Sequence, residues 1–220
     1  MSESLNTLQN EYLQAALSGS SIRAKQVVNK YLATGHTAKE LYLNIFQAVA
    51  HLTGELWLDN KISVAQEHIV TAIIKRHMGE MHQKFHPAQV RNRKVVLGCV
   101  ENESHSMGLR MVRDFFEEDG WEVIYLGANV PMRAFVSIVQ KTSPDIVGIS
   151  VQMEQHLPSV LDLIKRMNKA GLELPIMVGG QPFTKYKDLE KTMPITFVGM
   201  DAQDAVNKAN QIMEQMQAHE

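Results

Sequence analysis

Along roughly the first 90 residues, apolar side chains recur at the three- and four-residue spacing of helices that bury one face. One such helix begins after the Ser/Gly segment 18–21, ends at Gly35, and has apolar positions at Val27, Val28, Tyr31 and Leu32. Capping-box spacing at 37–40 and 63–66 opens two longer helices, which we expect to end near Trp57 and near Phe85. Four helices with connections this short predict an antiparallel four-helix bundle over residues 1–88.

After a linker at 86–93, the pattern changes to short β-branched runs that alternate with helical segments. Gly120 and Gly171 end two of these helices, and Pro131 suits the first turn of another. Strand followed by helix, repeated, predicts an α/β domain whose parallel sheet is covered on both faces. Over residues 89–220 this favours a five-stranded, flavodoxin-like (Rossmann-like) fold with strand order 2-1-3-4-5. The expected strands are 95–100, 122–126, 146–151, 176–178 and 195–198.

Composition excludes several classes of protein. The 22 Lys and Arg against 24 Asp and Glu give a formal net charge of −2, so neither a nucleic acid nor an anionic membrane is indicated as a partner. The single cysteine, Cys99, rules out a disulfide framework and a cysteine-rich metal site. There is no apolar run of the roughly 20 residues that a membrane helix needs, and the N-terminus lacks a signal-peptide pattern. We expect a soluble cytoplasmic protein.

Polar and glycine residues follow the expected strands where a ligand would bind. Open parallel sheets bind ligands beyond the carboxyl ends of their strands, at the switch point between the first strand and the third. The segment 101–108, rich in acids and serine, follows the first strand, and the third ends at Ser150. A glycine pair at 179–180 follows the fourth strand, and Gly199 follows the fifth. These residues therefore predict one site at one edge of the sheet.

Three common ligands of this fold do not suit that edge. A receiver domain needs a phosphoacceptor Asp where Ser150 stands, the acids of the first loop would repel a flavin phosphate, and the glycine spacing of a dinucleotide site is absent. What remains is His105, two residues beyond Glu103, as an imidazole that a carboxylate orients. One such ligand would hold a bare ion weakly. A metal already chelated by a macrocycle, such as a corrin, needs only an axial ligand.

Taken in order, the motifs at this edge resemble the signature of the cobalamin-binding domain family. In that family the signature histidine displaces the cofactor's own base, so the resemblance implies that His105 is the lower cobalt ligand. It also implies that the serine and the glycines line the slot for the nucleotide tail. Two positions depart from the usual pattern: Glu103 stands where Asp is commoner, and Gln152 stands where the family has Leu. The residues that the resemblance assigns to cobalamin binding are Glu103, Ser104, His105, Gly108, Ser150, Gln152, Gly179 and Gly180.

The helical half resembles the bundle that caps the upper face of cobalamin in this family. Trp57, followed after nine residues by Glu67 and His68, is similar to the signature of CarH-type photoreceptors, which depend on adenosylcobalamin. There these side chains cover the adenosyl group together with a valine one turn before the pair, here Val64. The resemblance therefore implies adenosylcobalamin as the preferred form. Because the bundle takes every residue before 90, we expect no helix-turn-helix domain.

The leading hypothesis is a stand-alone, non-enzymatic light sensor that binds cobalamin. Photolysis of the adenosyl group would change its conformation or its association, either as a homo-oligomer or with a regulator protein in signal transduction and transcription regulation. The alternative is a corrinoid methyl-carrier subunit of a methyltransferase system, and a passive cobalamin carrier is a third. Many CarH-type relatives have a histidine after the signature tryptophan that ligates cobalt once adenosyl has left. Leu58 stands there instead, so we expect water or hydroxide to cap the cobalt after photolysis, with His68 or His51 as the alternative ligands.

Three further histidines, His77, His82 and His86, are not predicted to bind a metal. His82 and His86 have the spacing of two ligands on one helix face, but Pro87 disfavours helical geometry at His86. We therefore expect all three to lie on solvated surface.

Overall fold

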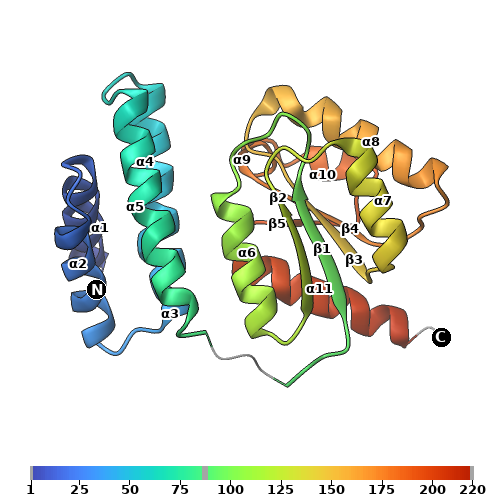
Figure 1. Cartoon of the computed structure of the whole chain (residues 1–220), viewed down its shortest axis with the longest axis horizontal. Coiled ribbons are helices and arrows are strands. Elements are labelled where there is room, and N and C mark those ends of the chain that lie inside the picture. Colours follow the sequence, from blue (N-terminus) through green and yellow to red (C-terminus); the bar gives the residue numbers. More distant parts are fainter. Residues whose placement is uncertain (1, 86–88, 219–220) are drawn as a thin grey trace. The chain divides into compact units, whose positions relative to one another are not determined.

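A computed structural model describes residues 2–85 and 89–218, and the chain divides into two compact units, Met1–His86 and Pro87–Glu220. The first unit consists of helices, and the second is a sheet flanked by helices (Figure 1). The expected boundary at residue 88 and the histidine at 86 lie outside the described residues. Within the two described ranges, no helix is both long enough and apolar enough to cross a membrane.

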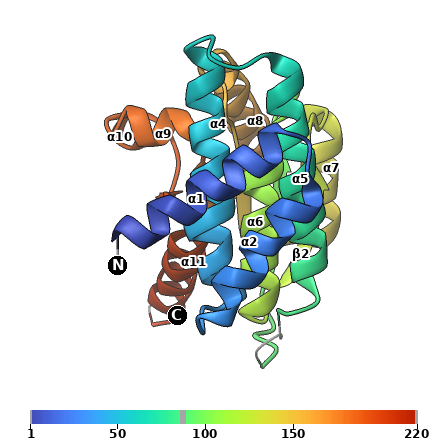
Figure 2. The same cartoon turned by 90° about the vertical axis from the view of Figure 1, so that its left-hand side faces the viewer.

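The helices of the first unit form a bundle in which α1 packs against α2, α4 and α5 (Figure 2). Because α3, η1 and α4 follow one another without a break, they form one continuous helix. The described residues of this unit therefore form four helices in all, which confirms the predicted bundle. Its elements are α1 (Ser2–Leu17), α2 (Ser21–Ala33), α3 (Ala38–Leu41), the π-helical segment η1 (Tyr42–Gln47), α4 (Ala48–Leu58) and α5 (Val64–His82).

Two helix starts follow directly from side-chain capping. The Thr37 hydroxyl accepts from the Glu40 backbone N–H while the Glu40 carboxylate accepts from the Thr37 N–H, and Ser63 and Gln66 repeat this exchange. Both helices therefore begin where their sequences predict. The C-terminal end of α5 was predicted less well, because the helix stops at His82 rather than near Phe85.

The π-helical segment η1 is a feature that the apolar spacing did not predict. A π turn holds more residues than an α turn, and here Tyr42, Ile45 and Phe46 are all fully buried. The Tyr42 hydroxyl donates to the Met78 carbonyl oxygen at 2.9 Å, which joins η1 to α5. The apolar residues at 41, 45, 49 and 52 suit a regular helix equally well, so periodicity alone could not locate the wide turn.

His77 contradicts the expectation of a surface histidine. Its side chain on α5 is 1% exposed, with Nδ1 2.8 Å from the Tyr12 hydroxyl and Nε2 3.2 Å from the Ser21 hydroxyl. Tyr12 comes from α1 and Ser21 from the start of α2, so the imidazole joins three helices. Burial lowers the pKa of His77 below its ordinary value of 6.5, against the opposing attraction of Glu80.

The second unit is a doubly wound α/β domain, and its sheet confirms the predicted fold. All pairings are parallel and the strand order is β2-β1-β3-β4-β5. The strands are β1 (Lys94–Cys99), β2 (Glu122–Gly127), β3 (Ile146–Ser150), β4 (Ile176–Gly179) and β5 (Phe197–Gly199). Between and after them lie α6 (Met107–Glu118), α7 (Met132–Thr142), η2 (Glu154–His156), α8 (Leu157–Lys169), α9 (Gln181–Lys185), α10 (Leu189–Thr192) and α11 (Ala202–Gln217).

The direction of each connection decides which face its helix covers. The chain moves one way across the sheet from β1 to β2 and the opposite way from β2 through β3 and β4 to β5. Since such crossovers are right-handed, α6 lies on one face and α7 and α8 lie on the other. α11 packs beside α6, and α7 packs beside α8 (Figure 1). The reversal between β1 and β3 is the switch point, so their carboxyl ends form the place where a ligand is expected.

We expect protonation of His77 to destabilise the helical unit. Because the folded-state pKa is lowered, the unfolded chain takes up the proton first as the pH falls below 6.5. The His77 contribution to the free energy of unfolding is therefore complete above that pH and is lost as the pH falls toward the folded-state pKa. Urea unfolding at about pH 7.5 and about pH 5.5 should show a smaller loss for His77→Gln than for the wild type.

His36→Gln is the matched control for this measurement. The His36 side chain is 43% exposed in the same unit, so this variant removes a histidine and keeps the buried imidazole of His77. A His77→Gln variant that kept the full pH dependence would contradict the buried neutral imidazole.

Candidate functional site

The carboxyl ends of four strands meet in register at one edge of the sheet. Cys99 at the end of β1 is paired with Ser150 of β3, Ser150 with Gly179 of β4, and Gly179 with Gly199 of β5. Ser150 and Gly179, which are widely separated in the sequence, are therefore neighbours. The loop between β1 and α6 begins at the same edge and carries the predicted acid and histidine.

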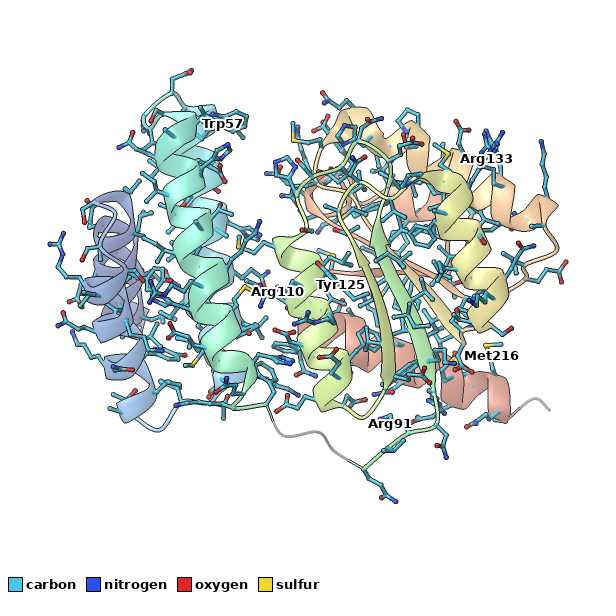
Figure 3. All side chains as sticks on the ribbon, viewed as in Figure 1. Trp57, Arg91, Arg110, Tyr125, Arg133 and Met216 are labelled. Carbon is cyan, nitrogen blue, oxygen red and sulfur yellow. The ribbon has the colours of Figure 1, made fainter. Side chains whose placement is uncertain are left out.

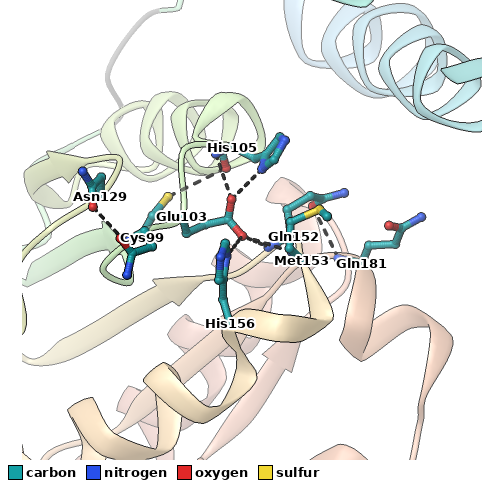
Figure 4. A network of polar contacts seen from close by, with 9 residues as sticks. Cys99, Glu103, His105, Asn129, Gln152, Met153, His156 and Gln181 are labelled. Atoms are coloured by element: carbon teal, nitrogen blue, oxygen red, sulfur yellow. Dashed lines mark hydrogen bonds and ion pairs between the residues drawn. The ribbon is translucent and has the colours of Figure 1, made fainter. Parts of the chain in front are cut away.

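The carboxylate of Glu103 is the centre of this edge, and it is fully buried (Figure 4). Its Oε1 accepts from the backbone N–H of His105 at 3.0 Å and from Nδ1 of the same residue at 2.6 Å. Its Oε2 accepts from the backbone N–H groups of Gln152 at 2.8 Å and Met153 at 3.0 Å. A further ring nitrogen, Nδ1 of His156, lies 3.1 Å from Oε2. Five N–H donors from two loops therefore surround one carboxylate.

These donors keep Glu103 ionised inside the protein. Burial alone raises the pKa of a carboxyl group. Here the hydrogen bonds from His105, from His156 and from the Gln152 backbone outweigh burial and hold the pKa of Glu103 well below its usual range. A buried carboxylate with this many donors is a fixed negative charge. It can orient an imidazole without becoming protonated itself.

His105 is where the site opens to solvent. Its side chain is 52% exposed, although the carboxylate that holds it is buried. With Nδ1 on Glu103, the nitrogen that a metal would take is Nε2, which is the usual arrangement of a metal-binding histidine and its carboxylate. The carboxylate itself is committed to N–H donors. This donor set offers one imidazole nitrogen, and it fits a metal already chelated by a macrocycle.

Cys99 adds no second ligand to this set. Burial, together with the nearby negative charge of Glu103, raises the pKa of its thiol to about 12. The Cys99 Sγ lies 3.8 Å from the His105 carbonyl oxygen, to which a protonated thiol donates. A protonated, buried thiol is a poor metal ligand.

Gln152 contacts Glu103 through its backbone, so its residue type does not reveal this role. Its backbone N–H, not its side chain, contacts Glu103, while its side-chain Oε1 accepts from the Gln181 N–H at 3.4 Å. That second contact joins the loop after β3 to the start of α9. The departure from Leu at this position therefore does not affect the contact with the acid.

Sequence reasoning missed two members of the network. His156 lies in η2, just after β3. Its place directly after a strand, at the edge where the ligand is expected, could have marked it as a candidate in the sequence. Asn129, in the loop after β2, accepts from the Asn102 N–H at 2.7 Å and donates its own N–H to the Glu103 carbonyl oxygen at 2.8 Å. It supports the loop that carries His105, and nothing local in the sequence marks it.

The three glycines of the predicted site differ in what they have around them. Gly180 has φ +123°, and a Cβ there would lie 1.8 Å from the Val151 carbonyl oxygen, so the fold itself requires glycine. At Gly179 a Cβ would lie 3.1 Å from the Gly199 carbonyl oxygen. At Gly108, in the first turn of α6, a Cβ would meet no atom within 4 Å. Of the three, Gly108 faces open space that a ligand can occupy.

The residues predicted to form a cap lie at the end of α4 and in the first turns of α5 of the helical unit. Trp57 is 38% exposed near the end of α4 (Figure 3), and Val64, the first residue of α5, is 53% exposed. The Glu67 carboxylate contacts His68 Nδ1 at 2.5 Å and accepts from the Thr71 hydroxyl at 2.7 Å. The predicted Glu–His pair is thus joined by a hydrogen bond, and the two apolar residues predicted with it are exposed.

Comparisons with known proteins show the family of the chain. The B12 binding domain family matches residues 93–209, and a second family with the same description matches residues 8–80. The chain belongs to the B12 binding domain family, and it is a corrinoid-binding protein.

Its relatives include both corrinoid proteins and a repressor. The trimethylamine corrinoid protein of Methanosarcina barkeri is 28% identical over 193 residues, which are 84% of this chain and 87% of that protein. The HTH-type transcriptional repressor CarA of Myxococcus xanthus is 26% identical over 120 residues, which are 54% of this chain and 41% of that protein.

Two solved structures share the fold of most of the chain. The monomethylamine corrinoid protein of Methanosarcina barkeri has a TM-score of 0.84 at 16% identity, covering 94% of this chain and 99% of its own. The methanol:cobalamin methyltransferase complex MtaBC of the same organism has a TM-score of 0.53 at 17% identity, covering 94% of this chain and 80% of that one.

These matches change one expectation. Similarity over most of the chain is to corrinoid proteins, whereas the repressor is similar over about half of it. The expected special closeness to CarH-type photoreceptors is therefore not confirmed, and membership of the cobalamin-binding family is.

We expect Gly180→Ala to destabilise the protein and Gly108→Ala to leave its stability unchanged or slightly raised. At Gly180 the strained φ and the contact with Val151 should cost about 2 kcal/mol or more. At Gly108 an alanine meets nothing and favours the helix by up to about 1 kcal/mol. Urea unfolding of the full chain measures both changes, and equal effects of the two substitutions would contradict the contrast.

Proposed function

We propose that this protein is a corrinoid methyl carrier, the non-catalytic subunit of a methyltransferase system. The observation that carries the proposal is the pair of a buried carboxylate and a half-exposed imidazole at the switch point of a B12 binding domain. Similarity to a trimethylamine corrinoid protein over 84% of the chain supports it. The partners would be the methyltransferases that load and unload the methyl group.

In this proposal His105 would hold the cobalt as its lower ligand through Nε2, and Glu103 fixes the ring through Nδ1. When bound, the corrinoid cobalt supplies an atom that accepts and releases a methyl group. Ser104 and Gly108 lie in the same loop and first turn, and both are exposed, so they suit contact with the ring or its tail. Ser150, Gln152, Gly179 and Gly180 complete the proposed tail site from neighbouring strands.

For the helical unit, residues 1–88, we propose the role of a cap that covers the upper face of cobalamin. Trp57 and Val64 are exposed apolar side chains that a cofactor could cover, and the Glu67 carboxylate contacts the His68 ring. Residues 89–220 form the cobalamin-binding domain in this division. Cobalamin is the cofactor, with methylcobalamin as the working form.

A light sensor is the second candidate function. The observation that favours it is the same group of side chains, Trp57, Val64, Glu67 and His68, which resembles the adenosyl cover of CarH-type proteins. Adenosylcobalamin would then be the preferred form, with homo-oligomers or a regulator protein as partners. Leu58 weighs against the light sensor. It stands where many CarH-type proteins have a histidine that binds cobalt after the adenosyl group has left, and a leucine side chain cannot bind a metal.

We expect His105→Ala to shift the visible spectrum of bound cobalamin to that of the form without an imidazole below cobalt. Glu103→Gln removes the acceptor that orients the ring, so its affinity for cobalamin should fall by about 10- to 100-fold. Absorption titrations with hydroxocobalamin measure both effects. His36→Ala, in the other unit, is the control, and an unchanged spectrum of His105→Ala would refute the ligand assignment.

We expect a methyl carrier to bind methylcobalamin at least as tightly as adenosylcobalamin. Trp57→Ala should then reduce the affinity for both forms by similar factors, since a general cover does not distinguish the upper ligand. Green light should leave the size of the adenosylcobalamin-loaded protein, measured by gel filtration, unchanged. A selective loss of adenosylcobalamin binding, together with a change of size in light, would favour the sensor instead.

A further inference from the structure

A basic cleft lies between α7 and α8, on the face of the sheet opposite α6 and α11. Its volume is about 340 Å³, and it joins one side of α7 to the C-terminal end of α8. Arg133, labelled in Figure 3, extends from the first turn of α7 and lines this cleft. The polar residues that line it are Arg133, Ser137, Gln140, Arg166 and Lys169.

The two helices are basic, although the whole chain has a formal net charge of −2. Together they carry five Lys and Arg side chains and one acid, Asp162. Asp162 does not line the cleft, and its carboxylate lies 3.5 Å from the Lys165 ammonium. Within the part of the chain that the structure describes, the five polar side chains of the cleft have no hydrogen bond or ion pair. Three cations therefore line one hollow, and no acid lines it with them.

The helix dipole accounts for only two of these cations. Arg166 and Lys169 lie in the last turn of α8, where a positive side chain stabilises the negative end of the helix. Arg133 lies in the first turn of α7, where the positive end of the helix disfavours a cation, and no acid shares that turn. Its placement therefore costs stability in the protein alone, which is typical of a residue kept for binding.

The donors of the cleft suit a compact anion with several oxygen atoms. A guanidinium group offers a planar fork of N–H donors that fits phosphate oxygens, and a lysine adds a point charge. The Ser137 hydroxyl and the Gln140 amide are further donors on the α7 side. The volume is close to the lower end of small-molecule pockets, which begin at about 300 Å³.

The apolar lining argues against a protein partner at this cleft. Among the described residues that line it, only Val136 and Ala170 are apolar, and none is aromatic. Protein interfaces depend on large anchors such as Trp and Tyr, which fill pockets and exclude water. A small anion needs no such anchor, because its affinity comes from charge and hydrogen bonds.

We propose that the cleft between α7 and α8 is a binding site for a small phosphate-bearing anion. Arg133 and Arg166 would hold phosphate oxygens from the two walls, and Lys169 would balance the charge of a second phosphate group. A diphosphate is the chemical class that uses all three cations. The site shares no residue with the Glu103 network, so it stands or falls separately from the proposed methyl-carrier function.

Calorimetric titration of the full chain with inorganic pyrophosphate, at about 0.15 M ionic strength, tests the proposal. We expect one site per chain, and an affinity lower by about 10-fold or more in Arg133→Gln and in Arg166→Gln. Arg133→Lys keeps the charge and loses the fork, so its affinity should be intermediate. Lys141→Gln is the matched control, because Lys141 is also on α7 and lies outside the cleft, and it should bind like the wild type.

Thermal unfolding of the same proteins gives a second measurement. Without pyrophosphate, Arg133→Gln should unfold at a higher temperature than the wild type, because it relieves the repulsion from the helix dipole and the other cations. Added pyrophosphate should raise the unfolding temperature of the wild type and of Lys141→Gln, and it should leave that of Arg133→Gln nearly unchanged.

Two results would overturn the inference. Equal losses of pyrophosphate affinity in Arg133→Gln and Lys141→Gln would show a response to overall charge and no site in the cleft. Wild-type protein that binds no pyrophosphate would also refute it. If that protein bound a hexaglutamate peptide and Arg133→Gln did not, the cleft would be a docking site for an acidic protein segment instead.

Discussion

A negative charge buried without access to water must be surrounded by donors, and the carboxylate of Glu103 imposes this constraint on the whole edge of the sheet. Its donors come from its own loop and from the loop after β3, on the two sides of the switch point. Meeting that requirement fixes how the two loops approach each other, and it fixes the ring of His105. The extra methylene of Glu over Asp gives the carboxylate a longer reach between the loops.

Much of the fold could be predicted because its determinants are local in the sequence. Two capping boxes lie within four residues each, and they place the starts of α3 and α5 correctly. The strands of the second unit are short apolar runs between helices, and the alternation alone implies a parallel sheet. The pairing of Glu103 with His105 was also predictable, because both residues lie in one loop directly after a strand.

What the sequence did not reveal depends on contacts between distant segments. His77 is buried because Tyr12, 65 positions earlier, supplies a hydroxyl partner, and no local pattern shows that. His156 reaches Glu103 across 53 positions, and Gln152 contributes a backbone N–H that any residue type could supply. Gly180 was interpreted as space for a ligand, yet its own φ and the Val151 carbonyl group already require glycine.

The position of His105 on a loop has a consequence for how its chemistry can be adjusted. A half-exposed ring on a loop takes its orientation from hydrogen bonds rather than from packing. A change in the partners of Glu103 can therefore alter the basicity of Nε2 while the sheet and its helices stay the same. The partners other than His105 follow β3, and loops tolerate substitution better than the elements they connect. In this chain two histidines contact the acid, the half-exposed His105 and the more buried His156.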